Sequence, residues 1–179
     1  MSRLDCETPV GRAWIARQRE TAARCAVAWR VEVMGTVEPC RVDAMLARDG
    51  CLLAAAEIKS RAMTFAQLQK HGTYLVTFEK LTAGRELAAQ LCVPFLLIVG
   101  LLDAIVYWQI SNAEGEWCCL PITIDKTTTQ ATSNGGIAER LNAYIPANKR
   151  AGLHPIGVYP ACLPADASGA MLNAREIPF

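Results

Sequence analysis

The sequence predicts an α/β domain with a mixed central sheet, and three observations support this fold class. A helical pattern over residues 12–30 precedes a group of apolar, strand-like segments. A second helical pattern, over about 78–91, separates these segments from two further apolar runs, 94–99 and 105–110. With 179 residues, 52% of them hydrophobic, the chain is long and apolar enough to bury a core. This order of elements favours helices packed on a central sheet.

The N-terminal part of the chain combines one helix with a β-hairpin. Apolar residues recur every three or four positions through 12–30, which is the spacing of one face of an α-helix. Asp49-Gly50 then lies between two short apolar runs, and this pair favours a hairpin turn because both residues tolerate positive φ. Segments 41–46 and 51–58 are therefore predicted to be antiparallel neighbours.

The remaining elements follow from the same kind of local pattern. Strand character is predicted at residues 31–42, 74–77, 94–99 and 105–110, and helices at 64–70 and 78–91. Beyond residue 110 we expect a strand over 117–124, a polar loop over 125–136 that either faces DNA or is inert, and a short helix over 137–145. The proline-rich remainder favours ordered loop and edge strand. Residues 1–179 are predicted to form one domain, with a core at about 12–110 and a C-terminal elaboration at 111–179.

Composition and charge exclude several classes of protein. The net charge is +1, so the chain lacks the basic balance of many nucleic-acid-binding proteins, and any phosphate-binding surface must be local. The eight cysteines form no C-x-x-C pair and only two histidines are present, so no structural zinc site is predicted. Most of these cysteines lie among apolar neighbours, which is typical of a reduced, intracellular protein.

No segment predicts membrane insertion or export. The longest apolar run, residues 93–102, has 10 residues including a proline and is too short to span a bilayer. Residues 1–12 contain acids and no apolar core segment, so we do not expect a signal peptide.

Charged residues of opposite sign stand at the end of the second hairpin strand. Side chains alternate between the two faces of a strand, so Glu57 and Lys59 are expected on one face and Ile58 on the other. Such a pair is either a surface ion pair or part of an active site. Asp43 lies on the preceding predicted strand, 14 positions before Glu57, with the Asp-Gly turn between them. This second carboxylate favours the active-site interpretation.

Asp43 followed by Glu57-Ile58-Lys59 resembles the PD-(D/E)XK nuclease superfamily, with Val42-Asp43 in place of the family's Pro-Asp pair. The order of elements is also similar, and segments 77–91 and 93–110 resemble those of the small phage and prokaryotic members. The resemblance covers about residues 12–110. It implies a restriction-endonuclease-like core, in which helices flank a mixed central β-sheet, and a metal-dependent nuclease activity.

The resemblance implies a role for each residue of this group. Asp43, Glu57 and the backbone carbonyl of Ile58 are expected to bind Mg²⁺ through oxygen ligands, and Mn²⁺ is expected to substitute for it. The metal would lower the pKa of a bound water and polarise the phosphate. Lys59 is expected to orient that water or to stabilise the transition state.

Three further charged residues are candidates. Glu20 resembles the acidic residue that some members use as an additional metal ligand, and its alternative role is a surface salt bridge with Arg24, four positions on. Arg61 and Lys80 are candidates for phosphate contact, although a solvated helix residue describes Lys80 equally well. The tryptophans are expected in the core, with stacking on bases as the alternative: Trp14, Trp29, Trp108 and Trp117.

The sequence therefore predicts a Mg²⁺-dependent deoxyribonuclease that hydrolyses phosphodiester bonds. The small size and the lack of a recognition domain favour an enzyme directed by DNA structure or by DNA ends over a sequence-specific one. One alternative keeps the fold as a non-catalytic nucleic-acid-binding or assembly module. Another makes the chain a subunit of a larger replication or recombination complex, in keeping with the near-neutral charge.

The expected partners are DNA and a second copy of the chain in a homodimer, with no membrane. The resemblance implies the cytoplasm of a prokaryotic cell or of a phage-infected host, and a context of DNA recombination or repair. Internal cutting and cutting from an end both fit the sequence.

Overall fold

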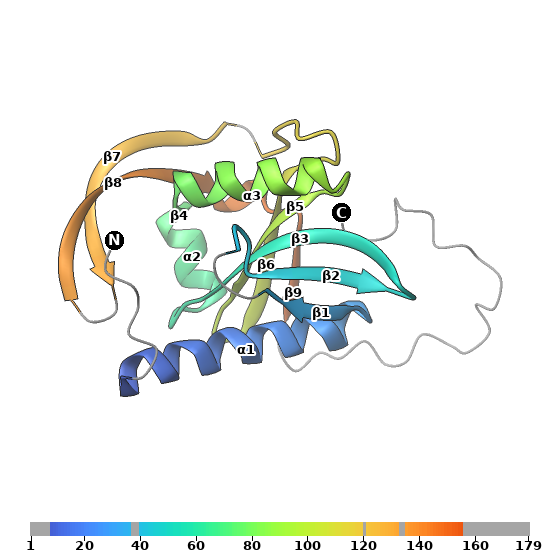
Figure 1. The fold of residues 1–179 in the computed structure, drawn as a ribbon. Helices are drawn as coiled ribbons and strands as arrows, with labels where there is room; N and C mark the ends of the chain where they lie inside the picture. The colour runs from blue at the N-terminus through green and yellow to red at the C-terminus, as the bar shows by residue number, and fades with distance from the viewer. Residues whose placement is uncertain (1–7, 37–39, 120, 133–134, 156–179) are drawn as a thin grey trace.

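The computed structural model describes residues 8–36, 40–119, 121–132 and 135–155. Figure 1 shows one long helix along one side of a central sheet, two shorter helices on the other side, and a curved hairpin extending from the body. The helices are α1 (Pro9–Trp29), α2 (Phe65–His71) and α3 (Phe78–Gln90), with a 3-10 turn, η1, at Ala147–Lys149. The strands are β1 (Glu32–Gly35), β2 (Ala44–Arg48), β3 (Cys51–Ser60), β4 (Thr73–Thr77), β5 (Phe95–Gly100), β6 (Ala104–Ser111), β7 (Thr123–Thr132), β8 (Gly135–Pro146) and β9 (Gly152–Pro155).

The central sheet is mixed, as predicted. Its strand order is β1-β2-β3-β5-β6-β9, with β3 and β5 parallel and every other neighbouring pair antiparallel. A second sheet, β4-β8-β7, is antiparallel throughout. The parallel pair requires a crossover, and this connection contains α2, β4 and α3. The α/β fold with helices flanking a mixed sheet is therefore confirmed.

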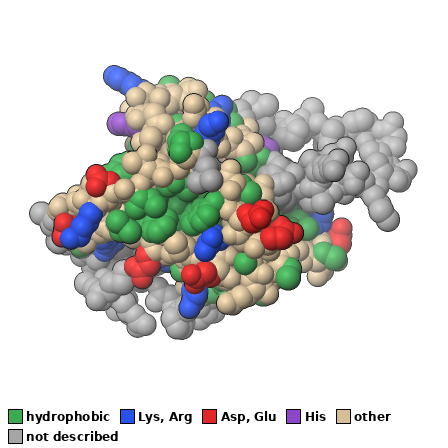
Figure 2. Space-filling model, turned by 90° about the horizontal axis from the view of Figure 1, so that it is seen from above, with side chains coloured by type: hydrophobic (Ala, Val, Ile, Leu, Met, Phe, Trp, Pro, Cys, Tyr) green, Lys and Arg blue, Asp and Glu red, His purple; other side chains and the backbone are tan. Residues whose placement is uncertain are grey.

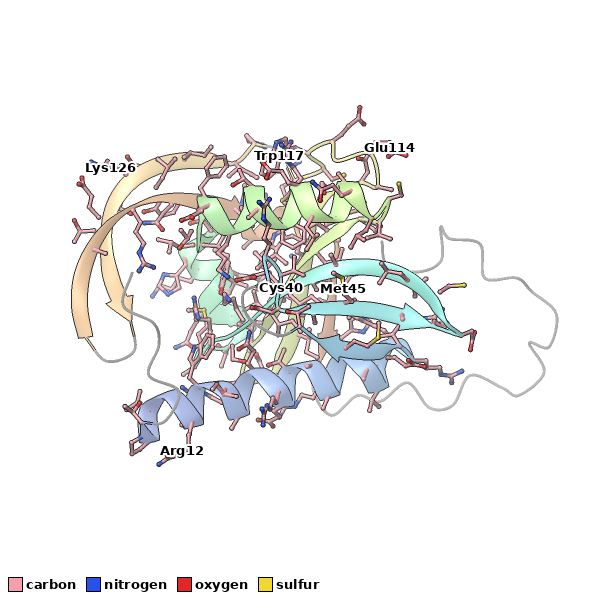
Figure 3. The ribbon with its side chains drawn as sticks, in the orientation of Figure 1. Arg12, Cys40, Met45, Glu114, Trp117 and Lys126 are labelled. Carbon is pink, nitrogen blue, oxygen red and sulfur yellow. The ribbon has the colours of Figure 1, made fainter. Side chains whose placement is uncertain are left out.

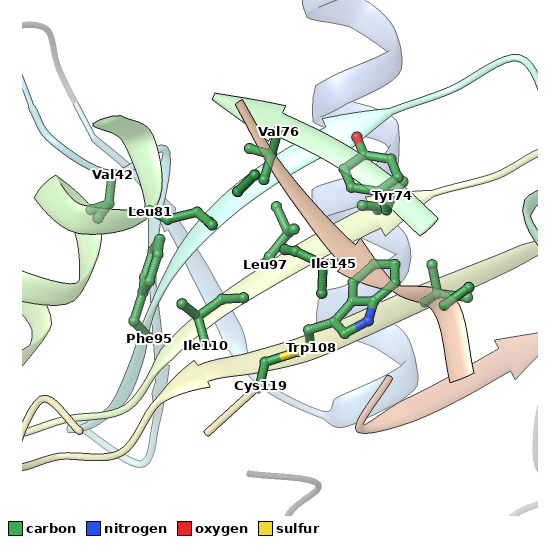
Figure 4. Close-up of a cluster of buried hydrophobic side chains, with 14 of the residues drawn as sticks. Val42, Tyr74, Val76, Leu81, Phe95, Leu97, Trp108, Ile110, Cys119 and Ile145 are labelled. Atoms are coloured by element: carbon green, nitrogen blue, oxygen red, sulfur yellow. The ribbon is translucent and has the colours of Figure 1, made fainter. Parts of the chain in front are cut away.

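Alternation along the central strands divides the interior into two apolar clusters. Even-numbered residues of β3, such as Ala54 and Ala56, pack with Cys25 and Trp29 of α1. Odd-numbered residues such as Ala55 face the opposite cluster, which α2, α3 and β4 cover (Figure 4). Glu57 and Lys59 also have odd numbers, so the strand periodicity directs both toward the side of α3 and β4.

Local sequence signals determine where several elements begin and turn. Thr8 caps α1, since its Oγ1 accepts a hydrogen bond from the backbone of Gly11 at 3.0 Å, and a proline follows at the first helical position. Thr64 forms a capping box at the start of α2. In the predicted hairpin turn, φ is 51° at Asp49 and 76° at Gly50. Both values lie in the left-handed region that an Asp-Gly turn favours, which confirms the hairpin.

The predictions for residues 117–145 are wrong. The expected polar loop at 125–136 and helix at 137–145 are instead β7 and β8, two strands of one long hairpin, and β7 begins only at Thr123. The residues of 137–145 include good helix formers, but β8 is paired on both sides, with β4 and β7, and this pairing overrides local propensity. The predicted edge strand corresponds to β9, while the later prolines lie outside the described residues.

Candidate active site

The candidate site lies where β3 ends beside the segment that leads into β2. Asp43 directly precedes β2, and its backbone N–H donates to the carbonyl of Ala56 on β3 at 3.0 Å. The Lys59 ammonium lies 2.5 Å from Oε1 of Glu57 and 3.2 Å from Oδ2 of Asp43. The structure therefore brings Asp43, Glu57 and Lys59 together around one ammonium group.

The Glu57 carboxylate is completely buried. Its side chain is 0% exposed, compared with 15% for Lys59 and 24% for Asp43. Oε1 meets an ammonium group without an aligned hydrogen bond, and Oε2 has no polar partner within the described residues. A buried carboxylate with an unused oxygen is destabilising unless a cation or a donor satisfies it. This burial is incompatible with a surface ion pair.

The electrostatics of the site follow from this burial. Burial raises the pKa of the Glu57 carboxyl; the Lys59 charge opposes this shift and the Asp43 charge adds to it. Burial by itself would lower the pKa of the Lys59 ammonium, but Glu57 and Asp43 outweigh it and raise the pKa above its ordinary value. Lys59 is therefore held in its charged form between the two acids.

Sequence reasoning does not identify Gln18 of α1, which the structure places at the centre of the site. Its Nε2 donates to Oδ2 of Asp43 at 2.8 Å and to the backbone carbonyl of Ile58 at 2.7 Å. Both acceptors belong to the predicted set of metal-binding oxygens. Gln18 lies at helical spacing between Ile15 and Ala22, so a polar residue within an apolar stripe is the signal that identifies it.

A set of hydrogen bonds holds α1 over the end of β3. The hydroxyls of Thr21 and Ser60 lie 2.8 Å apart, and each also lies 3.0 Å from the carbonyl oxygen of Arg17. Gly100 permits this close approach, because a Cβ atom there would lie 2.2 Å from Oγ1 of Thr21. These contacts fix the helix where Gln18 reaches Asp43.

Lys80 joins the site and Glu20 does not. Lys80, in the first turn of α3, places its Nζ 3.9 Å from Oε1 of Glu57 while its side chain remains 46% exposed. Glu20 lies on the outer surface of α1 with a 57% exposed side chain that pairs with Arg24. This is the alternative that the sequence suggested for Glu20, and a role as metal ligand stays a prediction.

Arg61 leads to Tyr74, the second residue that sequence reasoning misses. The guanidinium of Arg61 lies over the Tyr74 ring, 5.5 Å from its centroid. The Tyr74 ring also stacks on the ring of Trp108, with 5.5 Å between the two centroids. The Tyr74 hydroxyl points away from Trp108 and out of the apolar cluster (Figure 4), and it has no hydrogen-bond partner within the described residues. Burial raises its pKa, and the charges of Arg61 and Lys59 partly oppose that shift. A buried phenol thus borders the charged group.

A cavity of about 810 Å³ opens beside these residues, between α1 and the strands β1 and β2. Asp43, Lys59 and Lys80 line one part of it, and the region around Cys40, seen at the centre of Figure 3, lines another. The face shown in Figure 2 has apolar side chains gathered together, with acidic and basic side chains dispersed around them. The basic side chains do not form a broad basic face in that view.

The residues present fit a divalent cation. Asp43 and Glu57 supply carboxylate oxygens and Ile58 supplies a carbonyl, which are the hard oxygen ligands that Mg²⁺ prefers together with water. The unpartnered Oε2 of buried Glu57 is the observation that favours a cation here. Within the described ranges, no group of three or more His, Cys, Asp or Glu side chains is placed to hold a metal ion, so the carbonyl and water would complete the coordination.

A mixed sheet carrying Asp43 and, on the neighbouring strand, Glu57-Ile58-Lys59 defines a nuclease of the PD-(D/E)XK class. The family described as "phage putative PDDEXK endonuclease" matches residues 11–131, and the chain belongs to this family. This membership supports nuclease activity, and nucleases of this class usually use divalent metal ions. A comparison with curated proteins gives no match. No helix in the described part of the chain is long and apolar enough to cross a membrane.

Proposed function

We propose that the protein is a Mg²⁺-dependent deoxyribonuclease that hydrolyses DNA phosphodiester bonds. The observation that carries this proposal is the Glu57 carboxylate, fully buried with an unpartnered oxygen, beside Asp43 and Lys59. A buried carboxylate needs a positively charged or hydrogen-donating partner at each oxygen, and the Lys59 ammonium lies at Oε1 and leaves Oε2 without one. Family membership supports the nuclease class, and oxygen-only ligands support Mg²⁺ over softer metals.

In this proposal each residue has a distinct task. Asp43, Glu57 and the Ile58 carbonyl hold the cation, which supplies Lewis-acid polarisation and an acidified water when bound. Lys59, charged and fixed by two acids, stabilises the negative charge that develops on the phosphoryl oxygens as water oxygen bonds to phosphorus. The bond from phosphorus to the leaving sugar oxygen breaks, and the protons of the attacking water pass to that oxygen and to solvent.

Gln18 must adjust when a cation binds. Its amide N–H₂ group now donates to Asp43 and to the Ile58 carbonyl, the same groups that would hold the cation. Rotation of the amide exchanges the donor for the acceptor Oε1, so the side chain can satisfy the site both without and with a cation. Lys80, partly exposed at the cavity, is proposed to contact the phosphate of the substrate, and Arg61 a neighbouring phosphate.

A structure- or end-directed mode fits a chain of this size. The described elements belong to the two sheets and their helices, and none forms a separate recognition module. Sequence-specific readout requires base-edge contacts from an element placed in a groove. We therefore propose that DNA ends or junctions, rather than a base sequence, select the substrate.

The test is cleavage of labelled single-stranded, double-stranded, flapped and four-way DNA by the purified protein, with and without Mg²⁺ or Mn²⁺. We expect cleavage that requires metal and is lost in Glu57→Gln, which keeps the shape of the side chain and removes its charge. Metal-independent binding with no cleavage of any substrate would contradict the proposal and favour a non-catalytic module.

Two finer predictions are tested alongside. Homodimerisation and membership of a larger complex are checked by light scattering of the purified protein, alone and with DNA. Glu20→Ala, compared with Glu57→Gln, tests whether Glu20 contributes to metal affinity despite its pairing with Arg24.

A further inference from the structure

The cavity beside the active site has two chemically different parts. Near β3 it is lined by the charged groups of Asp43, Lys59 and Lys80. Further along α1 it is lined by the small side chains of Ala22, Ala23 and Ala26 and, from β1, by Val33. The volume of about 810 Å³ therefore combines a charged end, where a phosphate would be cleaved, with an apolar extension. A ligand that matches both parts carries an anionic group joined to a flat apolar one.

Trp14 stands at the charged end of the cavity, one turn of α1 before Gln18, whereas Ala22 and Ala26 follow Gln18 along the helix. It lines the cavity and is only half-buried, so it is not a core residue. Its ring centroid lies 5.7 Å from Nζ of Lys59, which places an aromatic face next to the proposed catalytic ammonium. The other tryptophan of this helix, Trp29, is by contrast buried in the apolar cluster beneath the sheet. Trp14 thus offers a ring to whatever lies beside the reacting phosphate.

A paired duplex cannot use such a ring. In a duplex the faces of the bases are stacked on one another, and only their edges are accessible in the grooves. An aromatic face and an apolar recess are reached by a base that has left the stack, as in single-stranded DNA or at a flipped or frayed nucleotide. Stacking is sequence-tolerant because every base has a π-face, which agrees with described elements that include no separate recognition module.

We propose that Trp14 and the apolar recess along α1 bind the bases of unpaired nucleotides on the two sides of the phosphate that is cleaved, so that the substrate is single-stranded DNA or an unpaired end. This inference rests on the proposed nuclease function for the location of that phosphate. The arrangement supplies charge complementarity at the reacting phosphate and a stacking platform beside it. Arg19, exposed on α1 and also lining the cavity, is placed to meet the backbone of the same strand.

The recess owes its depth to small residues on α1. Ala23 is exposed on the wall of the cavity, so a larger side chain there would project into the recess without displacing a core residue. This position provides a variant that blocks the apolar recess and leaves Trp14 and the charged residues in place. Val27 provides the matched control, because it is 58% exposed on α1 and does not line the cavity.

The experiment measures DNA binding in Ca²⁺ with two probes, a short oligothymidylate and a blunt duplex of equal length. The proteins compared are wild type, Trp14→Ala, Trp14→Phe, Ala23→Phe and Val27→Ala. Removing a base-stacking aromatic residue typically weakens binding by about 5- to 150-fold, so we expect a loss of this size for Trp14→Ala on the single strand and less than about twofold on the duplex. Trp14→Phe and Val27→Ala should retain most of the affinity. Ala23→Phe should lose single-strand affinity selectively.

A second readout does not depend on cleavage. Oligonucleotides with 2-aminopurine at successive positions should show fluorescence quenching at one position on wild-type protein, because the base stacks on an indole, and the quenching should disappear in Trp14→Ala. Melting curves check that each variant is folded. If Trp14→Ala does not fold, Ala23→Phe still tests the proposal.

The two hypotheses fail separately. Metal-dependent cleavage by wild type, together with equal affinity losses on both probes or unchanged binding in Ala23→Phe, would overturn the base site and leave the nuclease intact. Selective single-strand losses and quenching, without cleavage under any condition, would support the base site and overturn the proposed nuclease function.

Discussion

Lys59 is held between two acids, and this position separates its effect on chemistry from its effect on binding. Its ammonium is 2.5 Å from Glu57 and 3.2 Å from Asp43. Because it would stabilise charge that develops only in the transition state, we expect Lys59→Ala to lower the single-turnover rate in Mg²⁺ by at least about 100-fold. DNA affinity in Ca²⁺ should stay within about tenfold of wild type, because several basic groups contact the DNA phosphates and the loss of one weakens binding only modestly. Cleavage at the wild-type rate by this variant would exclude Lys59 from the mechanism.

Gln18 offers a second experiment at the scale of one side chain. Its amide bridges Asp43 and the Ile58 carbonyl, so Gln18→Glu adds a third carboxylate at that point. Without metal, repulsion and the lost hydrogen bonds should lower the melting temperature. With Ca²⁺, the added oxygen ligand should tighten the cation, and the increase in melting temperature should exceed that of wild type.

The comparison variant for Gln18 is Gln18→Leu, which removes the polar group without adding charge. It should be destabilised without metal and should gain no more from Ca²⁺ than wild type does. Equal Ca²⁺ responses in Gln18→Glu and Gln18→Leu would place the cation away from this helix.

At the scale of elements, α3 packs on β5 through a glycine. A Cβ atom at Gly84 would lie 2.2 Å from the ring of Phe95, whose side chain is fully buried. Gly84→Ala should therefore lower the free energy of unfolding by about 1–3 kcal/mol through overpacking, even though alanine favours a helix more than glycine does. Urea unfolding measures the change. Gly35→Ala is the control, because nothing lies within 4 Å of a Cβ atom there, and a comparable loss at Gly35 would show that close packing is not the cause.

The elements also show which parts of the structure the sequence determines locally. The Asp49-Gly50 hairpin, α1 and α3 carry their own turn chemistry or helical period, and the charged residues at the end of β3 follow from strand alternation. The hairpin of β7 and β8 does not, because residues 137–145 have helix-forming composition and become a strand through pairing with β7 and with β4, which lies more than sixty positions earlier in the chain. Gln18 and Tyr74 were missed for a related reason: each reaches the site from an element that local pattern treats as packing.

At the scale of the whole molecule, His154 connects the last strand of the central sheet to the end of α1. The indole N–H of Trp29 donates to Nε2 of His154 at 2.6 Å, so that nitrogen must be unprotonated. Burial lowers the pKa of His154 below its ordinary value. The unfolded chain therefore binds more protons than the folded one as the pH falls below about 6.5, and this part of the stability, complete above that pH, is lost on acidification.

Chemical denaturation between pH 8 and pH 5 tests this linkage. His154→Phe keeps a ring against Tyr107 and removes the titration, so its stability should fall less steeply with decreasing pH than that of wild type. At pH 8 the variant should be less stable, because the Trp29 hydrogen bond is gone. Parallel pH profiles for the two proteins would show that His154 does not titrate differently on folding.

Both sheets are completed by strands that the chain reaches late. Among the residues that the structure describes, β9 covers the edge of β6, and β4 pairs with β8 alone. A nascent chain that has emerged as far as β6 already contains Asp43, Glu57 and Lys59, yet β4, which carries Tyr74, has nothing to pair with and β6 exposes a free apolar edge. The ribosome therefore synthesises the two acids several dozen residues before the strands that complete the two sheets. At translation rates of about 5–20 residues per second, a nuclease of this design remains unfinished for seconds after its charged residues leave the ribosome.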